Sequence, residues 1–246
     1  MKKKSYLPFV AIIVCVLLCV SACSSKKQTS TVEHQQLTWH EKREKPFGTF
    51  DYPEITEKEA FDLLKNKFNV HVPNFVKEVK EMLKADVKSK GMQEGDPEFT
   101  MYASGDELKA RAYYPINDRD ELRVFALVDL KYSYNKEKKE VRLTSQSLSM
   151  TTYGQKITYP KDNFDELLAK SAEIIDLPKK LTDQSIQHFK EEYKEIDKRP
   201  ASSKAIVYSN DQEAVEKKKV SQSLLGGFDS KQELKEIYAS IVDYTD

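Results

Sequence analysis

Hydrophobic positions begin to recur with a helical period near residue 56. Thr56 and Glu59 have the spacing of a capping box, in which the hydroxyl and the carboxylate satisfy each other's free backbone N–H groups. A second amphipathic stripe follows Pro73, a residue that suits the first turn of a helix. The pattern predicts two helices, the first with a buried stripe of Ala60, Phe61, Leu64 and Phe68 and the second with Phe75, Val76, Val79, Met82 and Leu83.

From Glu98 the hydrophobic period changes to two, the period of a strand. Ser104-Gly105-Asp106 and the charged run 135–139 have the composition of turns between strands. Sequential strands joined by short turns favour an antiparallel meander, with one face buried and the other in water. The predicted strands cover residues 99–104, 108–114, 122–132 and 141–152.

After Pro160 the helical period returns. We expect a helix over 162–175 and another that Thr182 caps, with Ile186, Phe189, Tyr193 and Ile196 on its buried stripe. A short strand is expected at 204–209, and 210–222 is either a weak helix or a loop. Ser230 and Glu233 form a second capping box, which predicts a last helix that buries Leu234, Ile237, Tyr238 and Ile241. The expected fold class is α+β, an antiparallel β-meander of about four strands packed with N-terminal and C-terminal helices.

The first 23 residues have the pattern of an export signal. Lys2, Lys3 and Lys4 form a basic segment, and an almost unbroken apolar run from Leu7 to Val20 follows it. Fourteen residues are fewer than the ~20 that a helix needs to span the hydrocarbon of a membrane. The run therefore fits the hydrophobic region of a signal peptide, and an uncleaved single-pass anchor is the alternative.

Val20-Ser21-Ala22-Cys23 resembles the lipobox of bacterial lipoproteins. The resemblance implies cleavage after Ala22, a diacylglycerol on the Cys23 thiol together with acyl chains such as palmitate, and anchoring at the extracytoplasmic face of the cell membrane. At least two acyl chains give stable anchoring, whereas one holds weakly. The Lys-rich, Gly-poor composition is similar to that of lipoproteins from low-GC Gram-positive bacteria. No narrower family is indicated by the residues.

The predicted processing divides the chain. Residues 1–22 are the signal peptide, 23–49 a lipidated N-terminus with a flexible tether rich in Ser, Thr, Lys, Gln and Glu, and 50–246 an α+β extracytoplasmic domain. Two smaller lobes that meet near 178–182 are the alternative to one domain. Cys15 and Cys19 leave with the signal peptide, and the lipid occupies Cys23. The mature domain is thus expected to fold without a disulfide.

Charge and hydropathy limit the classes of function. The 246 residues include 40 Lys+Arg and 40 Asp+Glu, and the mean hydropathy is −0.65. Loss of Lys2, Lys3 and Lys4 leaves 37 basic residues against 40 acidic ones, a net charge near −3. A nucleic-acid partner is therefore not expected, and neither is a polytopic membrane protein.

The sequence offers no recognisable catalytic motif. The histidines, His34, His40, His71 and His188, have no metal-ligand spacing, and no Gly-x-Ser-x-Gly elbow or phosphate-binding loop is present. The acidic run 117–121 resembles a calcium loop only in its charge, because it has no central glycine and Arg119 lies in its middle. We interpret it as a solvated turn. No cofactor, metal site or enzymatic activity is predicted.

Tyrosines gather on and beside the predicted sheet, at positions 102, 113, 114, 132, 134, 153 and 159. Such rings can stack on sugars or hold a peptide, but tyrosine also suits half-buried strand positions. The apolar run Leu224–Phe228 is either a segment of the core or an exposed patch. The candidate binding surface drawn from these features consists of Tyr132, Tyr134, Tyr153, Leu225 and Phe228.

The expected function is that of a membrane-anchored surface lipoprotein without catalytic activity. It would act as an interaction or accessory factor at the cell envelope, in envelope signalling or in colony and biofilm form. Its expected partners are the membrane, through the lipid, and an envelope protein or an extracellular polymer. Two alternatives stay open: a receptor lipoprotein for a small molecule or glycan, and an envelope hydrolase with an unrecognised carboxylate site.

Overall fold

A computed structural model describes residues 38–154 and 158–245. The signal peptide, the lipobox and Cys23 lie outside these residues. Among the helices that the model describes, none is long and apolar enough to cross a membrane.

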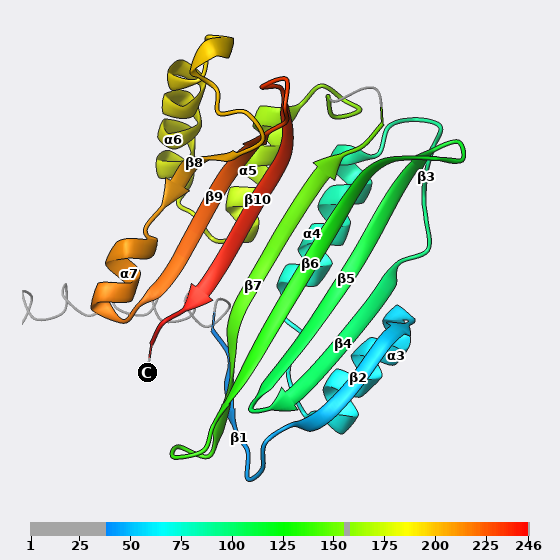
Figure 1. Cartoon of the computed structure of the whole chain (residues 1–246), viewed down its shortest axis with the longest axis vertical. Helices are drawn as coiled ribbons and strands as arrows, with labels where there is room; N and C mark the ends of the chain where they lie inside the picture. Colours follow the sequence, from blue (N-terminus) through cyan, green and yellow to red (C-terminus); the bar gives the residue numbers. More distant parts are fainter. Residues whose placement is uncertain (1–37, 155–157, 246) are drawn as a thin grey trace, which may run out of the picture. The chain divides into compact units, whose positions relative to one another are not determined.

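The described residues form one antiparallel sheet of ten strands (Figure 1). Eight strands follow one another in the order β2-β4-β5-β6-β7-β10-β9-β8. The short strands β1 and β3 pair with one end of β7 and of β5, respectively. The strands are β1 (His40–Lys42), β2 (Gly48–Ile55), β3 (Met92–Glu94), β4 (Glu98–Gly105), β5 (Glu107–Asp118), β6 (Glu121–Asn135), β7 (Glu140–Thr152), β8 (Lys204–Ser209), β9 (Val220–Phe228) and β10 (Leu234–Asp243).

The helices are short, and two of them end in a π-helical turn. They are α3 (Glu57–Asp62) with the π-turn η2 (Leu63–Lys67), α4 (Asn74–Met82) with the π-turn η3 (Leu83–Val87), α5 (Phe164–Ile174), α6 (Lys179–Glu192), the 3₁₀ turn η4 (Ile196–Lys198) and α7 (Asp211–Lys217). The predicted capping box at the start of α3 is confirmed. The Thr56 hydroxyl accepts the Glu59 N–H at 3.3 Å, and the Glu59 carboxylate accepts the Thr56 N–H at 2.9 Å.

The hydrophobic core lies between one face of the sheet and the helices. On β5 every second residue from Leu108 to Ile116 is buried, and the same alternation holds along most of β6. In Figure 1, α3, α4 and α5 lie behind the sheet, so the view is onto the face that they leave uncovered. The sheet therefore has a helix-covered face and an uncovered face, as antiparallel sheets commonly do.

The order of elements repeats once along the chain. A pair of helices (α3 and α4) precedes the antiparallel strands β4 to β7, and a second pair (α5 and α6) precedes β8 to β10. The last strands of the two halves, β7 and β10, pair antiparallel in the interior of the sheet, from Glu236↔Thr151 to Val242↔Ser145. The two halves thus share one continuous sheet.

The predicted fold class was wrong. Four predicted strands correspond to β4, β5, β6 and β7, but these form only part of a ten-stranded sheet rather than a complete meander. The predicted C-terminal helix is strand β10. Leu234, Ile237 and Ile241 fit a helical stripe by spacing, yet Ile237, Ala239 and Ile241 fit the period of a strand equally well, and these three are buried.

The second predicted capping box is a turn. The Asp229 side chain accepts the N–H groups of Lys231 and Glu233 at 2.8 and 2.9 Å, which folds residues 229–233 into the connection between β9 and β10. An aspartate that binds backbone N–H groups two and four residues on is a turn former. The hydrogen bonds of Asp229 therefore form a turn at the position where Ser230 and Glu233 predicted the start of a helix.

Residues 38–49, predicted to be part of the flexible tether, contribute to the described fold. Strand β1 pairs with β7, and the Trp39 carbonyl accepts the Leu143 N–H at 2.9 Å. Phe47 is buried against Phe68, with ring centroids 6.1 Å apart. These aromatic residues connect the start of the described chain to the core.

Candidate binding surface

The five residues proposed from the sequence lie in different parts of the fold. Tyr132 is fully buried and its hydroxyl donates to the His71 carbonyl at 2.6 Å. Tyr134 is also buried, and Phe228 packs beneath the sheet against Phe189 of α6, with ring centroids 6.1 Å apart.

The other two proposed residues are accessible. Leu225 is half-buried on the uncovered face of β9, and Tyr153 is 59% exposed just after β7. The structure therefore does not assemble the five residues into one surface. Tyrosines that point into the core supply packing and a hydrogen bond, as Tyr132 does.

A group of aromatic side chains does form on the uncovered face, near one end of β5, β6 and β7. Tyr113 of β5 lies across from Leu127, and its ring centroid is 5.7 Å from that of Phe125 on β6. The Tyr153 N–H donates to the Arg123 carbonyl at 2.8 Å, which fixes Tyr153 at the end of the same strands. We call Tyr113, Phe125 and Tyr153 the aromatic patch.

Tyr113 of the aromatic patch is partly desolvated and stays uncharged. Burial raises the pKa of the Tyr113 phenol, and the nearby Glu98 carboxylate and Tyr153 phenol raise it further. Its hydroxyl is therefore a neutral group at physiological pH, able to donate and to accept hydrogen bonds. The rings offer flat apolar area that costs little side-chain entropy to hold in place.

A polar pocket lies further along the same face. Asp129 of β6 accepts two hydrogen bonds from the Arg111 guanidinium of β5, at 2.6 and 2.9 Å, and this carboxylate raises the pKa of Arg111. The pocket beside this pair has a volume of about 330 Å³ and is lined by Asp51, Thr100, Met101, Tyr102, Lys109, Arg111 and Asp129. Its Tyr102 ring is 47% exposed.

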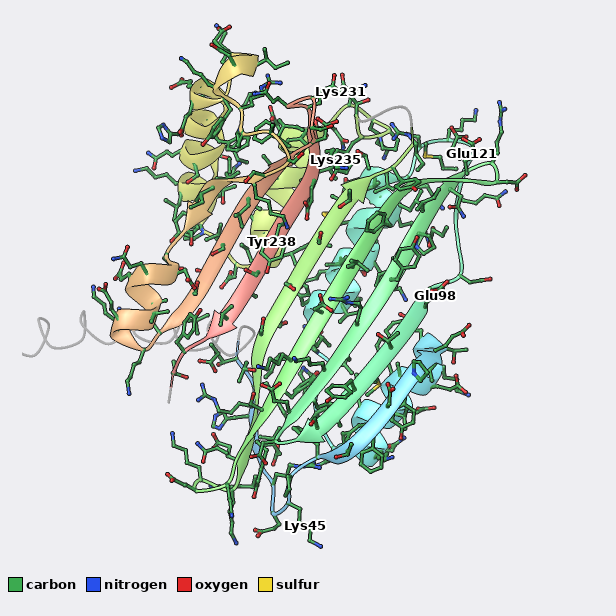
Figure 2. The ribbon with its side chains drawn as sticks, in the orientation of Figure 1. Lys45, Glu98, Glu121, Lys231, Lys235 and Tyr238 are labelled. Atoms are coloured by element: carbon green, nitrogen blue, oxygen red, sulfur yellow. The ribbon has the colours of Figure 1, made fainter. Side chains whose placement is uncertain are left out.

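A second polar group crosses the C-terminal half of this face. The Glu236 carboxylate accepts from the Ser149 hydroxyl at 2.6 Å and pairs with the Lys204 ammonium at 2.7 Å. Lys204 also lies 4.5 Å above the ring of Tyr238, which Figure 2 labels on β10. Gly227 is required here, because a Cβ at this position would lie 2.8 Å from the Cβ of Glu236.

The described histidines and the acidic run considered as candidate sites in the sequence lie at the surface or in a turn. His40 and His188 are exposed and lie 3.2 and 3.6 Å from Glu140 and Glu192. The acidic run 117–121 spans the end of β5, the two-residue turn at 119–120 and the first residue of β6, so it includes the turn that its composition predicted. Among residues 38–154 and 158–245, no three His, Cys, Asp or Glu side chains are grouped so that they could hold a metal ion.

Sequence reasoning placed Tyr102, Tyr113 and Tyr153 on or beside a sheet but missed Phe125 and the pairing of Arg111 with Asp129. The alternation along β5 and β6 could have located part of this surface, because adjacent strand residues such as Tyr113 and Tyr114 must point to opposite faces. What the alternation could not show is which face the helices cover.

Comparison with known proteins gave no match: no family model, no curated protein and no solved structure resembles this chain at the level of significance applied.

Proposed function

We propose that this protein is a lipid-anchored protein of the extracytoplasmic face of the cell membrane, and that it binds an extracellular polysaccharide through the uncovered face of its sheet. The observation that carries the proposal is the aromatic patch on that face, with the hydrogen-bonding side chains of the polar pocket on neighbouring strands.

Polysaccharides fit this chemistry because each sugar ring has apolar C–H faces and a rim of hydroxyls. The rings of Tyr113 and Phe125 supply area for stacking, and the Tyr113 hydroxyl can exchange hydrogen bonds with a sugar. The Arg111–Asp129 pair is already held by two hydrogen bonds, so its remaining donor and acceptor positions are oriented before a ligand arrives. Binding by such a surface needs no net charge on the polymer.

The position of the aromatic patch supports presentation away from the membrane. The described chain begins beside β1, which pairs with the first residues of β7. Phe125 lies near the opposite end of the neighbouring strand β6, about ten residues from Asn135, which corresponds to about 33 Å of strand. The expected tether from Cys23 to Thr38, about 15 residues, has a typical reach of roughly 20 Å. The expected tether thus joins the folded domain at the end of β7 that is far along the strands from the patch.

The glycan proposal is tested by co-sedimentation of the chain from Ser24 to Asp246 with insoluble polysaccharide purified from Gram-positive cell walls. We expect binding that the double variant Tyr113→Ser/Phe125→Ser weakens by roughly tenfold, because two stacking rings are lost. Ile196→Ser is the matched control, since Ile196 is a similarly apolar side chain, 54% exposed on η4.

Equal sedimentation of the double variant and the control would overturn the assignment of the site. Loss of all polysaccharide binding in the unmodified chain, together with crosslinking of one envelope protein at position 113, would replace the polysaccharide by a protein partner.

The anchoring part of the proposal has a separate test. Cells that express the full chain should incorporate labelled palmitate into it, and Cys23→Ser should abolish the label and release the protein from the membrane fraction. Retention of label in Cys23→Ser would contradict lipidation at this residue.

A further inference from the structure

We infer that the protein has a second binding site, on the helix-covered side, for a small amphipathic carboxylate. The site is a cleft between α3, α4 and the strands β3 and β5, which we call the helix cleft. Its polar side chains lie away from the uncovered sheet face, and Pro115, which pairs with Phe125, is the lining residue that borders the aromatic patch. Variants of the cleft lysines therefore leave the proposed polysaccharide site unchanged.

The helix cleft consists of two adjoining cavities of about 460 and 240 Å³ that share Glu57, Lys80 and Glu94. Their combined size is within the range of pockets that hold small molecules, about 300–1,000 Å³. The cleft is open to solvent along α4, because Lys77, Lys84 and Glu94 on its rim are exposed.

One wall of the cleft is apolar. In the larger cavity it is made by Phe61, Val72, Pro73 and Val76, and in the smaller cavity by Leu83, Pro97, Pro115 and Ile116. Phe61 is held in place by edge-on packing against Phe99, with ring centroids 5.7 Å apart. Such a wall accommodates an alkyl chain or an aromatic body and gains free energy as apolar surface leaves water.

The polar floor of the cleft is a fixed triad of side chains. Both carboxylate oxygens of Glu57 accept from the Lys80 ammonium, at 2.6 and 2.7 Å, and the Tyr114 hydroxyl donates to the same carboxylate at 3.3 Å. Burial raises the pKa of Tyr114, so its hydroxyl remains protonated. An ammonium has three N–H donors, and two of those on Lys80 point at Glu57, which leaves one for a ligand.

The balance of charge selects an anion. Each acidic side chain of the cleft already has a lysine partner: Glu57 has Lys80, Glu94 has Lys88 at 2.7 Å, and Glu81 has Lys77 at 3.7 Å. Lys84, one helical turn beyond Lys80, lines the larger cavity and makes no ion pair within 4.0 Å among the described residues. Its charge reaches Glu94, whose pKa is lowered mainly by Lys88 and to a lesser extent by Lys84. A carboxylate between Lys80 and Lys84 would find two donors, whereas a cation would find no unpartnered acid.

The probe for this site is decanoate in its monomeric form, titrated calorimetrically into the chain from Ser24 to Asp246. We expect saturable binding of one equivalent, and no binding of decyltrimethylammonium, which has the same alkyl chain and the opposite charge. Lys84→Gln should weaken decanoate binding about tenfold through loss of a charge-assisted hydrogen bond, and Lys84→Arg should restore most of it.

Lys170→Gln is the matched control, because Lys170 is an exposed helix lysine that lines different cavities, one between α4 and α5 and one between α5 and α6. Lys84 is itself exposed, so Lys84→Gln should unfold at the temperature of the unmodified chain. Equal affinity of Lys84→Gln and Lys170→Gln, comparable binding of the cationic analogue, or absence of decanoate binding to the folded chain would each overturn the assignment. None of these results bears on the polysaccharide assay, whose variants lie on the other face.

Discussion

Gly226 of β9 lies against Phe189 of α6, and Gly226→Ala tests this packing. A Cβ at this position would lie 2.6 Å from the Phe189 Cζ atom, and 3.3 and 3.4 Å from the Phe189 Cε2 and Leu234 Cδ2 atoms. Without this crowding, alanine in a strand would stabilise the fold by roughly 0.5–1 kcal/mol, because glycine loses more backbone entropy on folding. The steric term therefore has to exceed that gain for the variant to be destabilised.

Phe189 has little room to move away. It is 2% exposed, and its ring lies 5.1 Å from that of Tyr193 and 6.1 Å from that of Phe228. Overpacking of a filled core costs about 1–3 kcal/mol. Subtracting the entropic gain leaves a range of about 0–2.5 kcal/mol, and we expect Gly226→Ala to lower the free energy of unfolding by roughly 1 kcal/mol, near the middle of that range.

The assay is urea unfolding followed by circular dichroism, with the slope of the transition unchanged. In a double-mutant cycle, Phe189→Leu makes space for the methyl group, so Gly226→Ala/Phe189→Leu should be more stable than the sum of the single changes predicts, by at least ~0.5 kcal/mol. Ser223→Ala, elsewhere on β9, is the control and should change stability by less than ~0.5 kcal/mol. A Gly226→Ala variant as stable as the control, or strict additivity in the cycle, would refute this account of the packing.

Three further changes probe other parts of the fold. Thr56→Ala should lower the free energy of unfolding by ~1 kcal/mol, measured in urea, because α3 loses its N-terminal cap. Tyr132→Phe should cost about 0.5–1.5 kcal/mol in the same assay, because the buried Tyr132 side chain loses its hydrogen bond to the His71 carbonyl; an unchanged free energy of unfolding would contradict that hydrogen bond. Burial, reinforced by neighbouring carboxylates, raises the pKa of Glu78 in the folded state. The stability that its protonation gives is therefore complete below the unfolded pKa and is lost as pH rises through the folded pKa. Glu78→Gln should raise the thermal midpoint at pH 7 more than at pH 4, and an equal rise at both would contradict this.

The central strands were predictable because each has one apolar face. Along β6, Val124, Ala126, Val128 and Leu130 are buried, and the residues between them are only partly covered. A strand in this position shows its period in the sequence, whatever packs against it. The helix caps at Thr56 and the hairpin at Gly105 were predictable for a similar reason, since each depends on local hydrogen bonds or backbone conformation.

Strand β10 was not predictable from periodicity because it is partly buried on both faces. Ile237, Ala239 and Ile241 face the helices, while Ser240, on the opposite face, is only 6% exposed. The alternation that marks β6 is therefore obscured, and the remaining apolar residues fit a helical stripe equally well. Only the pairing with β7 and β9, contacts distant in sequence, decides between them.

The residues of the binding surface could not be predicted from the sequence, for a different reason. Adjacent residues of a strand point to opposite faces, so Tyr113 and Tyr114 were equivalent in the sequence. The packing of α3 and α4 makes Tyr114 a core residue, with its hydroxyl on Glu57, and leaves Tyr113 on the uncovered face beside Phe125. Local patterns predicted the strands β4 to β7 and placed tyrosines on them, and tertiary packing selected the rings that a ligand could reach.

The assignment of residues 234–243 as an interior strand has a consequence that a C-terminal helix would not have. Truncation after Gln232 removes β10, which pairs with β7 on one side and β9 on the other, so two long interior edges are exposed at once. Exposed edges of this kind promote association between chains. We expect the truncated chain to aggregate and to lose its cooperative unfolding transition in urea, because the halves no longer share one sheet. A helix packed on a finished meander could be removed with less damage, and a soluble truncated chain that keeps its sheet signal and a sharp transition would support that arrangement against the ten-stranded sheet.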